Sequence, residues 1–176
     1  MRRQGAGFSV TELMVVVAIV AILLGIGIPS YRYITNSYRM SAEVNGLLGD
    51  LQYARAEAIK EGLDVATCVS NNGTSCTGES DWAKGWIVLS GAGGTVLRVQ
   101  APFTGATPDS FVAGGNVSAI TYNREGFATT AAGFAGTTIR LHDSTASAAW
   151  TRCLIITAVG LLTTETRANS PSGTCT

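Results

Sequence analysis

An unbroken apolar segment near the N-terminus is the sequence feature that most limits the fold of this 176-residue chain. Residues 8–28 contain one ionisable group, Glu12, and as a helix they would span about 31 Å, close to the hydrocarbon thickness of a bilayer. Arg2 and Arg3 precede the segment, and no comparable basic cluster follows it at once. This asymmetry is typical of a cytoplasmic N-terminus. We therefore expect a single-pass inner-membrane protein whose remaining chain lies in the periplasm.

Two ordinary interpretations of this segment fit less well. A secretory signal peptide should end at a cleavage site of small residues, but Pro29-Ser30-Tyr31 stands there and the apolar run exceeds the usual length. A plain membrane anchor would have no use for Glu12, because a carboxylate at the centre of a membrane helix costs about 2.5 to 3.5 kcal/mol. Cleavage after Gly7 would create an α-amine at Phe8. We expect that amine, from the same chain or a neighbouring subunit, to neutralise Glu12.

The helical pattern continues beyond the apolar segment. Pro29 should bend the helix or mark where it leaves the membrane, because proline lacks the backbone donor and clashes with the preceding turn. From Tyr31 to Glu61 the periodicity is that of an amphipathic helix, and Gly62 is its predicted stop. We expect the strands that follow to cover its apolar stripe as a core. The predicted stripe consists of Ile34, Val44, Leu48, Leu51, Ala54 and Ala58.

After Gly62 the pattern changes from helical to strand-like. Short runs with alternating apolar residues are separated by Gly, Ser, Thr and Asn, which is typical of antiparallel strands. One helix followed by strands predicts an α+β domain with a single core. The predicted strands are residues 65–70, 86–90, 95–100, 117–122, 137–141 and 153–158.

The four cysteines all follow the apolar segment. An even number of cysteines in a chain with an export-type N-terminus favours two disulfides in an oxidising compartment. Three pairings of Cys68, Cys76, Cys153 and Cys175 are possible, and the sequential pairing is the simplest. Metal binding is less favoured, because there is no Cys-x-x-Cys pair and His142 is the only histidine. We expect no metal and no cofactor.

Charge and motifs exclude several classes of function. The formal net charge is zero, and loss of Arg2 and Arg3 with the first seven residues would leave the chain slightly acidic. A strongly basic domain would have indicated nucleic acid or anionic lipid as a partner, and this chain has no such bias. No nucleophile motif is present, and Glu57 and Glu61, one helical turn apart, are typical of a solvated face. We expect that the protein is not an enzyme.

The N-terminal motif resembles that of a known class of proteins. Gly7-Phe8-Ser9-Val10-Thr11-Glu12-Leu13, followed by an apolar stretch that ends at Pro29, resembles the class III signal of type IV pilins. The resemblance implies cleavage after Gly7 by a prepilin peptidase on the cytoplasmic side and N-methylation of Phe8. It also implies that Glu12 helps to dock the subunit in a filament.

The rest of the chain is similar to the GspH/FimT family of minor pilins and pseudopilins. The segments that carry the similarity are Leu51–Lys60 leading into the Cys68 strand, Gly85–Val88, Tyr122–Phe127 and the Cys153 strand. The family implies a pilin fold, in which a long helix packs on antiparallel sheet. It also implies a place at or near a filament tip, where the subunit would prime assembly. The implied partners are other minor and major pilins or pseudopilins and an inner-membrane assembly platform.

This resemblance divides the chain into four parts. Residues 1–7 would be the leader peptide, residues 8–29 the transmembrane and filament-core helix, residues 30–62 the amphipathic second half of the helix, and residues 63–176 the periplasmic β-rich domain. The sequence does not choose between a type IV pilus and a type II secretion pseudopilus, since both use the same leader and helix.

DNA binding for the uptake of extracellular DNA is the alternative function. Family members that bind DNA resemble one another in a Gly-Arg-x-Arg turn between the final strands. Here Gly160-Leu161-Leu162-Thr163 stands in its place, and Arg152 and Arg167 remain as candidate contacts. Because phosphate binding scales with the number of neutralised charges, two arginines predict weak binding.

Overall fold

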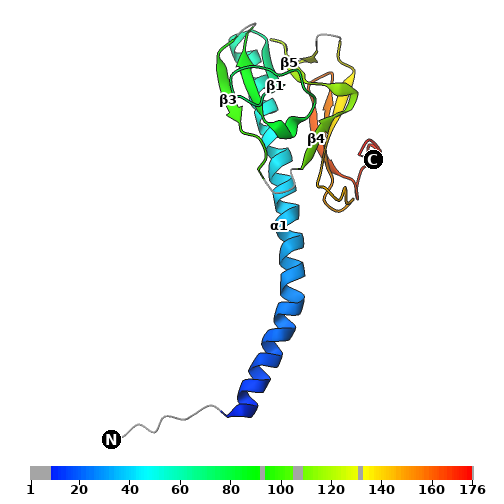
Figure 1. Ribbon diagram of the computed structural model, residues 1–176. Coiled ribbons are helices and arrows are strands. Elements are labelled where there is room, and N and C mark those ends of the chain that lie inside the picture. The colour runs from blue at the N-terminus through cyan, green and yellow to red at the C-terminus, as the bar shows by residue number, and fades with distance from the viewer. Residues whose placement is uncertain (1–8, 92–93, 105–108, 131–132, 176) are drawn as a thin grey trace, which may run out of the picture. The chain divides into compact units, whose positions relative to one another are not determined.

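The computed structural model describes residues 9–91, 94–104, 109–130 and 133–175 (Figure 1). Gly7 and Phe8 lie outside these residues. The chain forms two compact units, residues 1–38 and residues 39–176. Helix α1 (Val10–Glu61) contributes to both units, and every strand belongs to the second.

Helix α1 begins and ends close to the residues that the sequence predicts. It continues through Pro29, which lies inside the helix and does not end it. The helix ends at Glu61, where Gly62 has a φ of 68° and its N–H donates to the carbonyl of Ala58 at 3.0 Å. Glycine adopts this left-handed conformation without strain, so Gly62 is a suitable residue to end the helix, as predicted.

The buried face of α1 differs from the predicted stripe at three positions. Met40 is fully buried and fills the gap that the predicted stripe left before Val44. Leu47 takes the buried position assigned to Leu48, which is only partly buried, and Ile34 is exposed. The observed spacing alternates four and three residues, which keeps one face of a helix turned toward a partner. The buried residues are Met40, Val44, Leu47, Leu51, Ala54 and Ala58.

Two antiparallel sheets follow the helix. The first has the order β3-β2-β1-β5-β6, and the second has the order β4-β7-β8-β9. Their strands are β1 (Val65–Val69), β2 (Trp86–Ser90), β3 (Val96–Gln100), β4 (Ser110–Ala113), β5 (Ala119–Tyr122), β6 (Ala128–Thr129), β7 (Gly136–His142), β8 (Arg152–Thr157) and β9 (Leu162–Thr166). The six predicted strands are present with small shifts of their ends, whereas β4, β6 and β9 are additional. The predicted α+β architecture, a long helix packed on antiparallel sheets, is confirmed.

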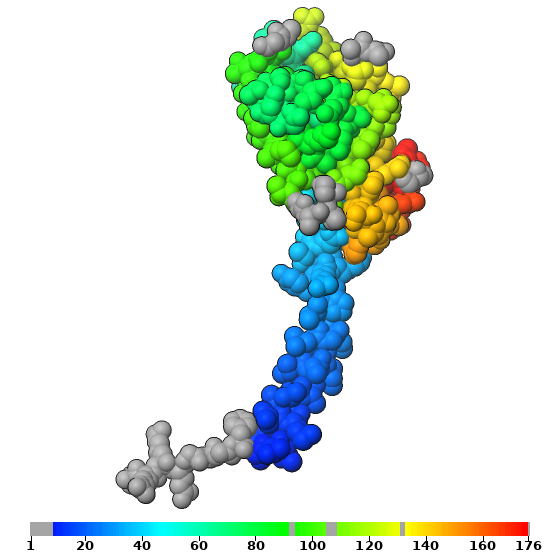
Figure 2. All heavy atoms as spheres, viewed as in Figure 1, coloured from blue at the N-terminus to red at the C-terminus, as the bar shows by residue number. Residues whose placement is uncertain are grey.

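One hydrophobic core joins the buried face of α1 to residues of both sheets. Trp86 of β2 packs edge-on against Phe103 and Phe111, with ring centroids 5.9 and 6.4 Å apart. Its indole Nε1 donates to the carboxylate of Asp50 on α1 at 2.8 Å, so this buried polar group is satisfied. In the space-filling view, the described residues of the second unit pack directly against one another (Figure 2).

Candidate functional site

Ser9 caps the N-terminus of α1. The N–H of Glu12 donates to Oγ of Ser9 at 3.2 Å, and the N–H of Leu13 donates to the Ser9 carbonyl at 3.1 Å. Ser9 is therefore the N-cap, and Glu12 lies at the third position of the first turn. The sequence analysis missed this role of Ser9, although the spacing Ser-x-x-Glu is a known signal for a helix start.

The position of Glu12 suits a carboxylate. The first turn of a helix carries unpaired N–H groups and the positive end of the helix dipole, which favour a negative charge. The cleavage predicted after Gly7 would place a new α-amine directly before Ser9. Gly7 and Phe8 lie outside the described residues, so cleavage and methylation stay predictions.

The surface of α1 over residues 13–28 is apolar on all sides. Each residue from 9 to 35 is exposed, and Glu12 is the single charged residue between positions 9 and 31. α1 is long and apolar enough to cross a membrane. A helix that is apolar all round requires a membrane or other helices as its environment. The large apolar side chains in question are Val10, Leu13, Met14, Val15, Val16, Val17, Ile19, Val20, Ile22, Leu23, Leu24, Ile26 and Ile28.

Tyrosines follow the apolar segment. Tyr31, Tyr33 and Tyr38 are all exposed. Tyrosine is enriched where a helix leaves the hydrocarbon region, since its ring is apolar and its hydroxyl is polar. These residues indicate where the apolar segment ends. They were not assigned this role from the sequence, although their positions shortly after Ile28 can be seen there.

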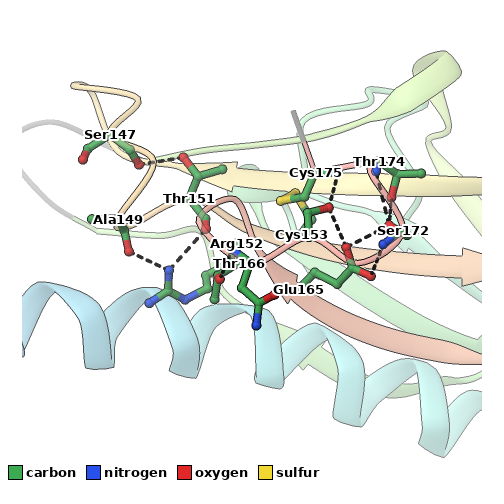
Figure 3. Close-up of a disulfide and its surroundings, with 12 residues drawn as sticks. Ser147, Ala149, Thr151, Arg152, Cys153, Glu165, Thr166, Ser172, Thr174 and Cys175 are labelled. Atoms are coloured by element: carbon green, nitrogen blue, oxygen red, sulfur yellow. Dashed lines mark hydrogen bonds between the residues drawn. A yellow bond between two sulfur atoms is a disulfide. The ribbon is translucent and has the colours of Figure 1, made fainter.

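Both expected disulfides are present, and they join neighbouring cysteines along the chain. Cys68 on β1 bonds to Cys76, and Cys153 on β8 bonds to Cys175 near the C-terminus, with Cα atoms 5.6 and 5.7 Å apart. The second bond fastens the C-terminal tail to the four-stranded sheet (Figure 3).

Glu165 on β9 holds the same tail by hydrogen bonds. Its carboxylate accepts from Oγ of Ser170 at 2.7 Å. It also accepts from the N–H and Oγ of Ser172 at 3.3 and 2.8 Å (Figure 3). The hydrogen bond from Ser170, followed by those from Ser172, lowers the pKa of Glu165, because these donors favour the ionised form.

The two candidate DNA contacts lie together but away from the β8–β9 turn. Nη1 of Arg152 donates to the carbonyls of Ala149 and Thr151 at 2.8 and 3.2 Å (Figure 3). The N–H of Arg167, which is exposed, also donates to the Thr151 carbonyl. Both arginines therefore lie at one end of β8 and β9, while Gly160 lies in the turn at the other end. The turn itself presents exposed Leu161.

The described residues contain no group of three or more His, Cys, Asp and Glu side chains placed to hold a metal ion. Nδ1 of His142 lies 2.9 Å from the carbonyl of Asp143. This contact with a backbone carbonyl orients the imidazole ring.

Comparisons with known proteins agree with this architecture. Residues 43–160 match the family described as "Type II transport protein GspH", and residues 2–28 match the "Prokaryotic N-terminal methylation motif". No curated protein sequence matches the chain significantly.

The fold is similar to that of the type IV minor pilin FimU of Pseudomonas aeruginosa strain PAO1. One crystal form of FimU matches with a TM-score of 0.60 and 21% identity, covering 81% of this chain and 99% of FimU. A second crystal form matches with a TM-score of 0.54 and 22% identity, covering 79% of this chain and 99% of FimU. At this identity the likeness establishes the fold alone.

Family and fold are those of pilin structural subunits rather than enzymes. Such subunits carry an apolar N-terminal helix that anchors them in a membrane, are processed by a prepilin peptidase and assemble with other pilins or pseudopilins. The GspH match extends over more than half of the sequence. The chain therefore belongs to the GspH/FimT family of minor pilins and pseudopilins.

Proposed function

We propose that this chain is a minor subunit of a type IV pilus or a type II secretion pseudopilus, and that it lies at or near the filament tip and primes assembly. The observation that carries the proposal is the exposed apolar helix with Glu12 as its single charge between residues 9 and 31. A carboxylate in such a helix is costly in lipid unless it meets a cation. An anchor without assembly gives no reason to keep it.

In this proposal, processing creates the partner of Glu12. A prepilin peptidase cleaves after Gly7, and the new α-amine of Phe8, which is then methylated, keeps its positive charge. Ser9 holds the first turn of α1 in place, so Glu12 presents its carboxylate at a fixed position. The amine of a neighbouring subunit pairs with this carboxylate, and the pairing offsets part of the penalty of an isolated charge.

The proposed topology follows from charge and redox chemistry. Arg2 and Arg3 keep the N-terminus in the cytoplasm until cleavage. The second unit, residues 39–176, lies in the periplasm, where the disulfides Cys68–Cys76 and Cys153–Cys175 form and persist. The assembly platform of the inner membrane then moves the subunit into the filament.

The decisive experiment replaces Glu12 in a strain that lacks the native gene. We expect Glu12→Ala to reduce the amount of subunit in sheared filaments by about tenfold or more, equivalent to about 1.4 kcal/mol of docking free energy. Glu12→Gln should show a similar loss, because it keeps the size of the side chain and removes the charge. Glu57→Gln, on the same helix but beyond the apolar segment, is the matched control and should assemble normally.

Two further measurements separate processing from priming. Mass spectrometry of the mature protein should find Phe8 as its first residue with one added methyl group. Deletion of the gene should reduce the number of filaments or the secreted product. Normal filament number without the gene, or normal assembly of Glu12→Ala, would contradict the proposal.

DNA uptake through Arg152 and Arg167 remains an untested prediction, and a gel-shift assay can separate it from the structural role. With two phosphate contacts, the logarithm of the DNA-binding constant should fall by no more than about 1.8 for each tenfold increase in salt concentration. Tight binding by the full chain in neutral detergent, with a salt slope near this value and lost when Arg152→Ala and Arg167→Ala are combined, would favour DNA uptake instead.

A further inference from the structure

An ion pair joins α1 to the start of β4 within residues 39–176. The guanidinium of Arg39 binds both carboxylate oxygens of Asp109, with Nη2 at 3.3 Å from Oδ1 and Nη1 in contact with Oδ2. Asp109 directly precedes β4, and its side chain is only 2% exposed. This contact fixes the turn of α1 at residues 39–43 to the second sheet.

A second carboxyl group shares the same guanidinium. Oε1 of Glu43, one helical turn after Arg39, lies 3.7 Å from Nη1, and the Glu43 side chain is 16% exposed. Oε2 of Glu43 is buried and has no hydrogen-bond partner within the part of the chain that the structure describes. One positive charge therefore faces two largely buried carboxyl groups, while the Arg39 side chain itself is 42% exposed to water.

The protonation state of Glu43 decides whether this cluster is balanced. When Glu43 is neutral, Arg39 and Asp109 form a balanced pair. Only the protonated acid has a hydrogen to donate to the Asp109 carboxylate, which lies close enough to act on Glu43. When Glu43 is ionised, one negative charge is uncompensated in a low-dielectric environment. Burial, followed by the charge of Asp109, raises the pKa of Glu43 to about 7, although Arg39 acts in the opposite direction.

Asp109 from the β4 side and Arg39 from α1 are the charged groups that act on Glu43. The preceding segment, residues 105–108, has the sequence Gly-Ala-Thr-Pro and carries no titratable side chain. The response to pH therefore belongs to these three residues.

We propose that Glu43, Arg39 and Asp109 form a pH-sensitive switch, which holds residues 39–43 of α1 against the start of β4 when Glu43 is protonated and loosens this contact when Glu43 ionises. The switch is independent of the proposed place in a filament, because all three residues belong to one unit of a single chain.

The direction of the effect follows from linkage. The folded-state pKa of Glu43 lies above its ordinary value of 4.5, so the folded protein binds this proton more tightly than the unfolded chain. The stabilising contribution is complete below about pH 4.5, is lost as the pH rises to about 7, and changes little above that. Between pH 5 and pH 8 the constant for opening this contact should rise by roughly a hundredfold.

The test uses the full chain in neutral detergent micelles. NMR of glutamate carboxyl carbons gives the titration midpoint of Glu43, whose signal is identified by its loss in Glu43→Gln. Hydrogen exchange, corrected for the intrinsic effect of pH, gives the protection of backbone amides in residues 39–44 and 110–113 at pH 5 and pH 8. Glu57→Gln, the same substitution farther along α1, is the matched control.

We expect a midpoint near 7 and at least tenfold lower protection of both segments at pH 8 in the native chain and in Glu57→Gln. Glu43→Gln should keep the same protection at both pH values, because glutamine reproduces the neutral acid. If Glu43→Gln does not fold, Asp109→Asn takes its place, and it should lower the midpoint of Glu43 by removing the neighbouring charge. A midpoint below 5, equal protection of the native chain at both pH values, or an undiminished loss in Glu43→Gln would overturn the proposal.

Discussion

The guanidinium of Arg55 on α1 donates from Nη1 to the carbonyl oxygen of Gly160 at 2.8 Å, in the turn between β8 and β9. Its Nη2 also donates to the carbonyl of Val159 at 3.3 Å. Gly160 has a φ of 77°, and a Cβ at this residue would lie 2.5 Å from the carbonyl oxygen of Gly126, in the turn between β5 and β6. Helix α1 and one turn of each sheet therefore meet at a single point.

Loss of this arginine should weaken the fold. Because hydrogen bonds to charged groups contribute about 1.5 to 3 kcal/mol, Arg55→Ala should lower the free energy of unfolding by about that amount. Denaturant unfolding of the full chain in micelles, followed by tryptophan fluorescence, measures the change. Arg167→Ala, on an exposed side chain, should change it by less than about 0.5 kcal/mol. An equal loss in both variants would disprove a specific role for Arg55.

The two disulfides should stabilise the fold to different extents. On the chain-entropy model, the eight-residue separation of Cys68 and Cys76 corresponds to about 2.5 kcal/mol, and the 22-residue separation of Cys153 and Cys175 to about 3.4 kcal/mol. Replacing both cysteines of the Cys153–Cys175 pair by alanine should therefore lower the free energy of unfolding more than replacing both cysteines of the Cys68–Cys76 pair. The comparison uses the same denaturant experiment, and the reverse order would show that local packing outweighs loop entropy.

Attachment of the C-terminal tail to β9 should weaken at low pH. The pKa of Glu165 is lowered in the folded protein, so its hydrogen bonds to Ser170 and Ser172 are complete above about pH 4.5 and are lost as the pH falls through the lowered value. Hydrogen exchange at the amides of Ser172 and Cys175 should therefore be faster, after intrinsic correction, at pH 3 than at pH 6. Glu165→Gln should remove most of this difference, whereas Glu125→Gln, in the connection between β5 and β6, should leave it in place.

Removal of the Ser9 cap should loosen the first turn of α1. Replacement of a serine N-cap by alanine costs about 1 kcal/mol, so amide exchange at residues 11–13 should be about fivefold faster in Ser9→Ala. Ser9→Asp should restore protection, because aspartate is also a good N-cap. If Ser9→Ala exchanges at the native rate in micelles, the hydrogen bond from the Glu12 N–H does not hold this turn.

Strong local patterns explain what the sequence predicted well. The apolar segment, the stop at Gly62 and strands such as β1 and β8 follow from hydropathy, turn chemistry and alternation, which are all local. The pairing of the cysteines needed the fold, since three connectivities satisfy the same spacing.

The remaining elements depend on contacts that are distant in the sequence. β6 has two residues and exists because Ala128 and Thr129 pair with β5. β9 begins with Leu162 and otherwise consists of threonines and one glutamate, since an edge strand with a single neighbour does not need an apolar alternation. The cluster around Glu43 joins Arg39 and Asp109, which are 70 positions apart, so no local sequence pattern predicts it.

The outward-facing apolar side chains of residues 10–28 also determine the thermodynamics of assembly. Lipid tails and neighbouring helices are similarly apolar, so movement from a bilayer to a bundle of helices leaves the same surface dry throughout. Dehydration then contributes little to the driving force, and in the proposed assembly the direction is decided by the pairing of Glu12 together with contacts of the β-rich unit. A filament of such subunits can lengthen or shorten without exposing the apolar helix surface to water.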